Sequence, residues 1–210
     1  DAVICVSHPF PLGFALLAFR RLYPTRIVLR MTGDQFAERS LHRNPLTRLR
    51  KYVMHELVMP RMLQQADALL CVGEGIAEQL KARGVPAEKI FYLPQPVDAT
   101  HFVKASCARR AKIRSELGIA PEDRMVLTVG SQTYGKGSDR IPKILDLTHD
   151  NPRRTHFVVV GDGPVRADLE AVASDRLHVL GQQPRQRVME LFSAADLLLH
   201  PTRRDGLPNV

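Results

Sequence analysis

The sequence predicts an α/β protein made of two doubly wound, Rossmann-like lobes with parallel sheets, both of them incomplete. Short apolar, β-rich runs alternate with helical periodicities along the chain, a pattern typical of parallel sheets with crossover helices. Two runs, "FVVV" and "DLLLH", are predicted to form strands that are buried by helices on both faces of the sheet. The proline-containing stretch "LPQPVDATHF" interrupts the pattern, so we assign one lobe to residues 1–102 and the other to residues 103–210.

The elements follow in a regular order. Strands are expected at residues 3–6, 27–31, 68–72, 90–93, 125–129, 157–160, 177–180 and 197–199. Helices are expected at residues 13–22, 45–65, 74–83, 107–117, 138–148, 164–173 and 185–194. The first lobe has about four strands, whereas complete doubly wound domains commonly have five or six. We therefore expect an internal fragment of a protein of roughly 350 residues.

Composition narrows the class of protein. The chain has 210 residues, 44% of them apolar and 25% charged, as in globular proteins. Its net charge of +8 would suit nucleic acid, anionic lipid or a phosphorylated small molecule. The absence of tryptophan and the scattered positive charge argue against a nucleic-acid partner, because few rings are available to stack on bases.

The three cysteines are far apart and include no Cys-x-x-Cys pair, and no histidine stands at metal-ligand spacing. We therefore expect no metal site and a reducing compartment. No apolar stretch reaches the 18 or so residues that span a bilayer, and no signal peptide opens the chain. The expected location is cytoplasmic, with peripheral contact to the inner face of the membrane left open.

In an open parallel sheet, ligands bind beyond the carboxyl ends of the strands, so the loops that follow strands are the places to search. "VGSQTYGKGS", residues 129–138, looks like a phosphate loop. An ATP-binding loop needs Ser or Thr directly after its lysine, and here Gly137 follows Lys136. Gly130, Gly135 and Gly137 would still let the backbone approach an anion, and Ser138 would cap the next helix. An exposed lysine in a glycine-rich turn is the alternative.

Two further loops lie in the second lobe. "VVVGDGPVRADLE", residues 158–170, is not a dinucleotide fingerprint because Arg166 replaces its third glycine, and a tight strand-to-helix turn is favoured. "HPTRRDGLPNV", residues 200–210, places Asp205 beside Gly206 and Asn209. A carboxylate can hold sugar hydroxyls and exposed amides can hold phosphate, although a polar surface turn would look the same.

The first lobe has two weaker candidates for an acceptor cleft. "RMTGDQFAERS", residues 30–40, carries Thr32, Gly33 and Asp34 after a strand, where an aspartate capping a turn is the alternative. His8 follows the first strand, and a turn or capping histidine would explain it equally well.

Taken in order, these loops resemble the group 1 (family 4) glycosyltransferases, retaining enzymes of GT-B architecture. The first lobe shows "ADALLCVGEGIAEQLKARGVPAEKIFYLPQPVDATHF", in which Gln95 and Pro96 replace the family's usual Asn-Gly. The second lobe shows the glycine-lysine-glycine loop, then "VVVGDGP", "HVLGQQPRQRVMELFSAADLLLHPT" and "DGLPNV". The resemblance implies the rear part of the acceptor-side lobe followed by the front part of the nucleotide-sugar-binding lobe.

The resemblance also implies a function, namely transfer of a sugar from a nucleotide-diphosphate-sugar donor to a glycan, lipid or small molecule, without metal or other cofactor. It makes Lys136 and Asp205 the catalytic residues. The donor would be bound by Gly130, Ser131, Lys136, Gly137, Gly206, Leu207 and Asn209. The family's usual arginine is replaced by Ser131, and its second late acid would lie beyond Val210. A catalytically inactive, nucleotide-binding scaffold is therefore the alternative.

The helical stretch at residues 41–62 is basic and amphipathic. Its apolar residues Leu46, Leu49, Val53 and Leu57 share one face, and its arginines and lysine lie elsewhere. Such a helix can dock on anionic lipid. We favour the alternative, in which the apolar face packs on the core and the charged face is solvated.

Overall fold

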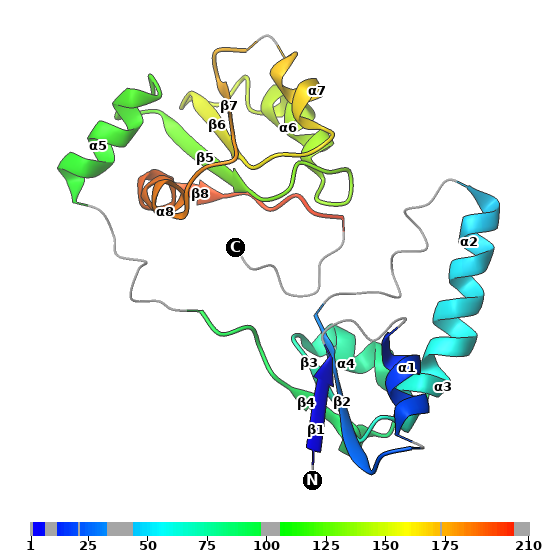
Figure 1. The fold of residues 1–210 in the computed structure, drawn as a ribbon. Coiled ribbons are helices and arrows are strands. Elements are labelled where there is room, and N and C mark those ends of the chain that lie inside the picture. The colour runs from blue at the N-terminus through cyan, green and yellow to red at the C-terminus, as the bar shows by residue number, and fades with distance from the viewer. Residues whose placement is uncertain are drawn as a thin grey trace. The chain divides into compact units, whose positions relative to one another are not determined.

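A computed structural model of the chain describes residues 2–6, 12–20, 22–32, 44–97, 106–172 and 174–203. These residues form two compact units, one up to Pro96 and the other from Val97 to Arg203 (Figure 1). Each unit has its own parallel sheet with its own core. The lobe boundary expected at residues 102 and 103 lies outside the described residues.

Unit 1 is built on four parallel strands in the spatial order β1-β2-β3-β4. The strands are β1 (Ala2–Val6), β2 (Thr25–Met31), β3 (Ala68–Cys71) and β4 (Ile90–Tyr92). The helical elements are α1 (Leu12–Phe19), α2 (Pro45–Tyr52), a π-helical segment (Val53–Val58), α3 (Met59–Gln65), α4 (Glu74–Lys81) and a 3₁₀ turn (Ala87–Lys89). From Pro45 to Gln65 the helix is continuous, as the sequence predicts.

The core of unit 1 lies on one face of its sheet. Along β2 the residues alternate, so Ile27, Leu29 and Met31 are buried while Arg26 is exposed. The buried face packs against α3 and α4. Each crossover moves one strand further in the same direction, and right-handed crossovers in one direction place their helices on the same face. The described part of this lobe therefore shows the helices of a single face.

Unit 2 is built on a sheet in the order β7-β6-β5-β8, again with parallel pairing throughout. The strands are β5 (Arg124–Val129), β6 (Thr155–Val160), β7 (Leu177–Gly181) and β8 (Leu197–Leu198). The helices are α5 (Cys107–Glu116), a 3₁₀ turn (Ser138–Arg140) leading into α6 (Ile141–Leu147), α7 (Arg166–Glu170) and α8 (Arg185–Ala194).

Helices cover both faces of the unit 2 sheet. On one face α5 and α8 bury Met125 and Leu127 of β5, and on the other α6 and α7 bury Val126 (Figure 1). From β5 the chain proceeds to β6 and β7 on one side, then returns through α8 to β8 on the other side of β5. The strand order thus reverses between β5 and β8, which is the topological switch point of a doubly wound sheet.

One of the two runs expected to be buried on both faces is not buried. Every residue of β6, which contains "FVVV", is buried as predicted. In "DLLLH", however, Leu197 is 55% exposed and Leu198 39% exposed. The prediction for this run was wrong because β8 is an edge strand of the described sheet, paired only with β5.

None of the helices that the structure describes has the length and apolar character that crossing a lipid bilayer requires.

Candidate functional site

The candidate site is formed by the two loops at the switch point of unit 2. One loop follows β5 and holds residues 130–137, and the other follows β8 and holds residues 199–203. The carboxyl ends of β5 and β8 lie side by side because these strands pair in parallel, Val126 with Leu197 and Leu127 with Leu198. A crevice at this position is where open α/β sheets bind their ligands.

The two loops are in direct contact at Gly137. This residue has a φ of +74°, and a Cβ added to it would lie 2.0 Å from the carbonyl oxygen of Pro201. The backbone N–H of Arg203 and the hydroxyl of Thr202 both donate to the carbonyl oxygen of Gly135, at 3.0 and 3.2 Å. Only glycine suits position 137, because its conformation is left-handed and leaves no room for a side chain.

Arg203 clamps the loops together through its side chain. Its two terminal nitrogens donate to the two carboxylate oxygens of Asp139, at 2.6 and 2.8 Å, and one of them also donates to the carbonyl oxygen of Tyr134, at 2.5 Å. The guanidinium carbon lies 4.0 Å from the centroid of the Tyr134 ring. The hydrogen bond from Arg203 lowers the pKa of Asp139, so the carboxylate stays charged and the bidentate pair persists.

Gln132 attaches the first loop to the turn that follows β6. Its buried side-chain amide donates to the carbonyl oxygens of Gly130 and Val160, at 2.9 and 3.0 Å. Its backbone N–H donates to the carbonyl oxygen of Asp162, at 2.9 Å. The loop is therefore held on two sides, by the β8 loop and by the β6 turn.

The Gly161-Asp162-Gly163 turn is a tight strand-to-helix turn, as the sequence predicts, and it also supports the site. A Cβ on Gly161 would lie 2.0 Å from the carbonyl oxygen of Gly130, and one on Gly163 would lie 2.4 Å from that of Gln132. Both glycines are needed for the close approach of the two backbones.

The four predicted donor-site residues of the first loop lie together beyond the carboxyl end of β5. Gly130, Ser131, Lys136 and Gly137 all lie between the end of β5 and the 3₁₀ turn, with Ser131 exposed and Lys136 half-buried. The backbone N–H of Lys136 donates to the Thr133 hydroxyl at 3.2 Å, which fixes the backbone from which this side chain extends. The ammonium group of Lys136 is thus carried by a loop that is fixed by contacts with the β8 loop and with the turn after β6.

The expected role of Ser138 as a helix cap is wrong. The capping position is Gly137, which has no side chain that could accept a hydrogen bond from the backbone, and Ser138 is the buried first residue of the 3₁₀ turn. The backbone N–H groups of Gly137 and Ser138 donate to the carbonyl oxygens of Tyr134 and Thr133. These two amides are used inside the loop, and Lys136 is the basic residue that the loop carries.

Several predicted site residues fall outside the described part of the chain. They are His8, Gly33, Asp34, Asp205, Gly206, Leu207 and Asn209. In the sequence Asp205 follows Arg203, the last described residue, by two positions. Thr32 is half-buried directly after β2, at the carboxyl edge of the unit 1 sheet. In the described ranges no group of three or more histidine, cysteine, aspartate or glutamate residues could hold a metal ion.

Sequence reasoning missed the residues that shape the site, namely Gln132, Asp139 and Arg203. A glutamine between two glycines in a loop was a weak signal, because such a residue is usually exposed. Asp139 and Arg203 are 64 positions apart, and no sequence pattern predicted that they would pair.

Comparison with known proteins matches both units. The family model described as "Glycosyl transferases group 1" matches residues 109–210, and the model described as "Glycosyltransferase Family 4" matches residues 1–101. The chain belongs to the group 1 glycosyltransferases.

Two curated relatives are similar to this glycosyltransferase over about 150 residues. It is 26% identical over 151 residues to "Putative teichuronic acid biosynthesis glycosyltransferase TuaC" of Bacillus subtilis, covering 71% of the chain and 36% of that protein. It is 29% identical over 154 residues to "Alpha-D-kanosaminyltransferase" of Streptomyces kanamyceticus, covering 69% of the chain and 39% of that protein. The matched region is thus less than two fifths of either relative.

Solved structures support the GT-B fold class. Anabaena HepE in complex with UDP-glucose has a TM-score of 0.71 at 18% identity, covering 95% of the chain and 53% of HepE. WaaG, "a glycosyltransferase involved in lipopolysaccharide biosynthesis", has a TM-score of 0.64 at 26% identity, covering 90% of the chain and 57% of WaaG. The chain therefore spans slightly more than half the length of these structures.

Proposed function

We propose that this glycosyltransferase moves a sugar from a nucleotide-diphosphate-sugar donor to a glycan, lipid or small-molecule acceptor, with retention of the anomeric configuration. The observation that carries the proposal is the pair of clamped loops at the unit 2 switch point, with Lys136 on one of them. Structural neighbours have been solved with UDP, with UDP-glucose and, for starch synthase IV of Arabidopsis thaliana, with ADP.

The chemistry places negative charge on the leaving group. When the glycosidic bond to the donor breaks, the departing nucleoside diphosphate carries the electron pair of that bond. A cation already positioned beside the diphosphate stabilises this charge without reorganisation, and Lys136 has this role in the proposal. The sequence has no Asp-x-Asp pair of the kind that binds a divalent metal in other glycosyltransferases, and we propose a metal-independent reaction.

The remaining roles follow the family pattern. Asp205 would orient the donor sugar through its hydroxyls, and the amides of Gly206 and Leu207 would bind the diphosphate, with Asn209 beside them. Ser131 and Gly130 would lie against the donor. On the acceptor side, Thr32, Gly33, Asp34 and His8 would line the cleft. Asp205→Asn should therefore impair turnover in the whole protein, with unchanged turnover contradicting the assignment.

Nucleotide titration tests the donor site directly. UDP, GDP and ADP are titrated without metal into the chain and into Lys136→Ala, with amide NMR shifts as the readout. Loss of a charge-assisted contact should weaken binding by about tenfold or more. Lys112→Ala is the matched control, since Lys112 is an exposed lysine of α5. Absence of binding, or equal loss in both variants, would contradict the proposal.

A catalytically inactive, nucleotide-binding scaffold remains the second candidate, because Ser131 stands where the family usually has an arginine. The two functions differ in turnover. A protein that binds a nucleoside diphosphate through Lys136 and yet neither hydrolyses nor transfers the sugar of any matching donor would be the scaffold. An NMR assignment of the product anomer would establish whether transfer proceeds with retention.

A further inference from the structure

The helix from Pro45 to Gln65 is too long for the sheet it packs against. At 1.5 Å per residue it extends about 30 Å. The longest strand of unit 1, β2, has 7 residues and spans about 23 Å. In consequence α3 carries buried residues such as Met59, Met62 and Leu63, whereas α2 has none. Figure 1 shows α2 leading away from strands β1 to β4 of its unit.

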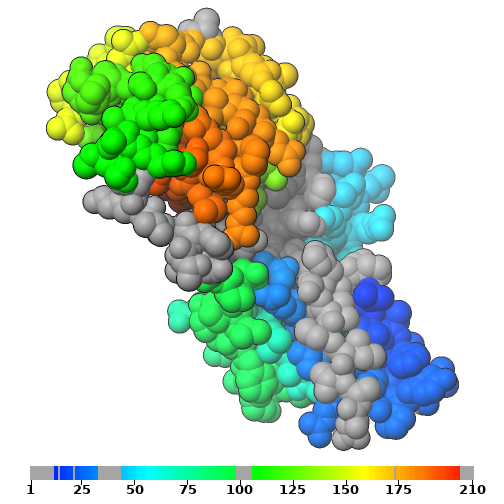
Figure 2. Space-filling model, turned by 60° about the vertical axis from the view of Figure 1, so that its left-hand side comes forward, coloured from blue at the N-terminus to red at the C-terminus, as the bar shows by residue number. Residues whose placement is uncertain are grey.

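The projecting part of this helix carries an apolar stripe that faces solvent. Leu46, Leu49 and Val53 follow at helical spacing and are 75%, 61% and 40% exposed, and Leu57 in the π-helical segment continues the stripe. The prediction that this face packs on the core is therefore wrong. Isolated exposed leucines are common on soluble proteins, but aligned ones indicate a binding surface. In the space-filling view the cyan residues of α2 lie at the surface (Figure 2).

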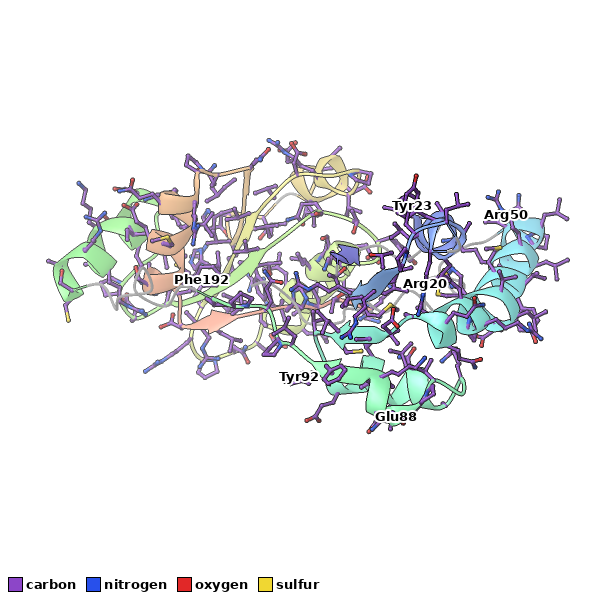
Figure 3. The ribbon with its side chains drawn as sticks, turned by 60° about the horizontal axis from the view of Figure 1, so that its bottom comes forward. Arg20, Tyr23, Arg50, Glu88, Tyr92 and Phe192 are labelled. Carbon is purple, nitrogen blue, oxygen red and sulfur yellow. The ribbon has the colours of Figure 1, made fainter. Side chains whose placement is uncertain are left out.

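Basic side chains lie on the same helix, outside the stripe. Arg48, Arg50 and Lys51 lie on α2, and no acidic residue occurs between Asn44 and His55. In Figure 3, Arg50 extends outward from its helix. Tyr52 is exposed beside the stripe and has the mixed apolar and polar character favoured at membrane interfaces.

We propose that α2 docks on an anionic membrane surface, with Leu46, Leu49 and Val53 entering the interface and the basic residues meeting lipid phosphates. A second copy of the same surface would bring like charges together, which disfavours self-association. Nucleic acid would satisfy the arginines but leave the leucines in water. An anionic bilayer satisfies both sets of side chains. The surface lies in unit 1, so the proposal does not depend on the nucleotide site of unit 2.

Vesicle sedimentation tests this surface. The chain is mixed with vesicles of neutral phosphatidylcholine, or of phosphatidylcholine with about one third phosphatidylglycerol, at low and at high salt. We expect binding to the anionic vesicles only, reduced by salt. Arg50→Glu/Lys51→Glu should weaken the partition coefficient by about tenfold or more, since each basic residue near the surface contributes appreciably. Leu46→Ser/Leu49→Ser should also weaken it, by removing the inserted apolar area.

Two control variants test whether vesicle binding depends on the α2 surface or only on the net positive charge of the chain. Lys112→Glu/Lys143→Glu changes the net charge equally but on exposed lysines of α5 and α6, and Leu147→Ser removes a leucine of unit 2 that is as exposed as Leu46, at 75%. Both controls should bind vesicles like the unaltered chain. The proposal is overturned if the chain does not bind anionic vesicles, if it binds neutral ones equally, or if the controls lose binding as much as the α2 variants.

Nucleotide titration of the α2 variants completes the test. They should bind nucleoside diphosphate as the unaltered chain does, because their substitutions lie in the other unit. Failure of nucleotide binding in every protein would contradict the proposed function and leave the membrane result standing.

Discussion

The two units use the same strand-and-helix alternation but differ in where the strand order changes direction. In unit 1 the order is sequential, so the described helices lie on one face of the sheet. In unit 2 the order reverses between β5 and β8, so helices cover both faces and two loops meet at the carboxyl edge. Connectivity, more than the composition of either unit, therefore decides at which sheet edge two loops meet.

The largest expected effect breaks the contact between the two unit 2 loops. Gly137→Ala adds a Cβ where the Pro201 carbonyl oxygen lies at 2.0 Å, in a left-handed conformation. Left-handed strain and overpacking should together lower the free energy of unfolding of unit 2 by about 3 kcal/mol or more, and nucleotide binding should be lost. Hydrogen exchange of the β5 and β6 amides measures this separately from unit 1.

Gly118→Ala is the matched control for this substitution. Gly118 also has a positive φ, +68°, but an added Cβ meets nothing within 4 Å. It should cost only the left-handed strain, about 1 to 2 kcal/mol, and leave nucleotide binding intact. Equal effects of the two substitutions would show that contact with Pro201 does not shape the site.

A smaller effect is expected when the clamp loses its charge. Arg203→Gln and Asp139→Asn should each weaken nucleoside diphosphate binding by about tenfold to a hundredfold, the loss expected when binding groups shift by around an ångström. The double variant should lose little more than either single one, because each removes the same interaction. Arg187→Gln, which breaks the ion pairs of Arg187 with Glu116 and Glu190, is the control and should bind normally.

The clamp should also resist acid. Since its pKa is lowered in the folded state, Asp139 contributes stability that is present above the unfolded carboxyl pKa of about 3.9 and lost only as the pH falls through the lower folded value. Hydrogen exchange of the unit 2 amides in Asp139→Asn and in the unaltered chain at several pH values, corrected for intrinsic rates, would measure this stability. A difference between the two proteins that disappears near neutral pH would contradict the assignment.

The smallest effect concerns two histidines at the amino ends of β6 and β7. His156 lies 3.1 Å from an Asp123 carboxylate oxygen and 3.0 Å from His178, and Arg154 and Asp175 are the other charged groups that act on it. Burial lowers the pKa of both histidines. As the pH falls, the histidines of the unfolded chain are protonated at a higher pH than those of the folded chain. The free energy of unfolding of unit 2 should therefore be highest above about pH 6.5 and decline below it.

Hydrogen exchange of the β6 amides between pH 7.5 and pH 5, corrected for intrinsic rates, would detect the decline. His178→Gln should reduce the pH dependence, because it removes one of the two titrating groups. An unaltered slope in that variant would mean that other groups carry the dependence.

Local patterns in the sequence were enough to predict the strands and helices, their order and the resemblance to the family. Hydrophobic runs such as 155–160 and helical spacing such as that of α8 are local, so the chain specifies them without distant contacts. The glycine and lysine of the β5 loop were also found from the sequence, since their chemistry is typical of anion-binding turns. The predictions of burial failed where burial depends on neighbouring elements. Leu197 is exposed because it lies on an edge strand, and Leu46 is exposed because its helix is longer than the sheet.

The contacts that hold the two loops of the site together became visible only in the folded structure. The sequence around Gln132, Asp139 and Arg203 contains no motif that predicts their roles. Gln132 bonds to Val160, and Arg203 pairs with Asp139, so each contact joins segments that are distant in the sequence. Gly137 is required by the Pro201 carbonyl group, which reaches it only because β8 pairs with β5. Contacts between loops depend on the order of the strands in the sheet. Local propensity and hydrophobic periodicity do not specify that order.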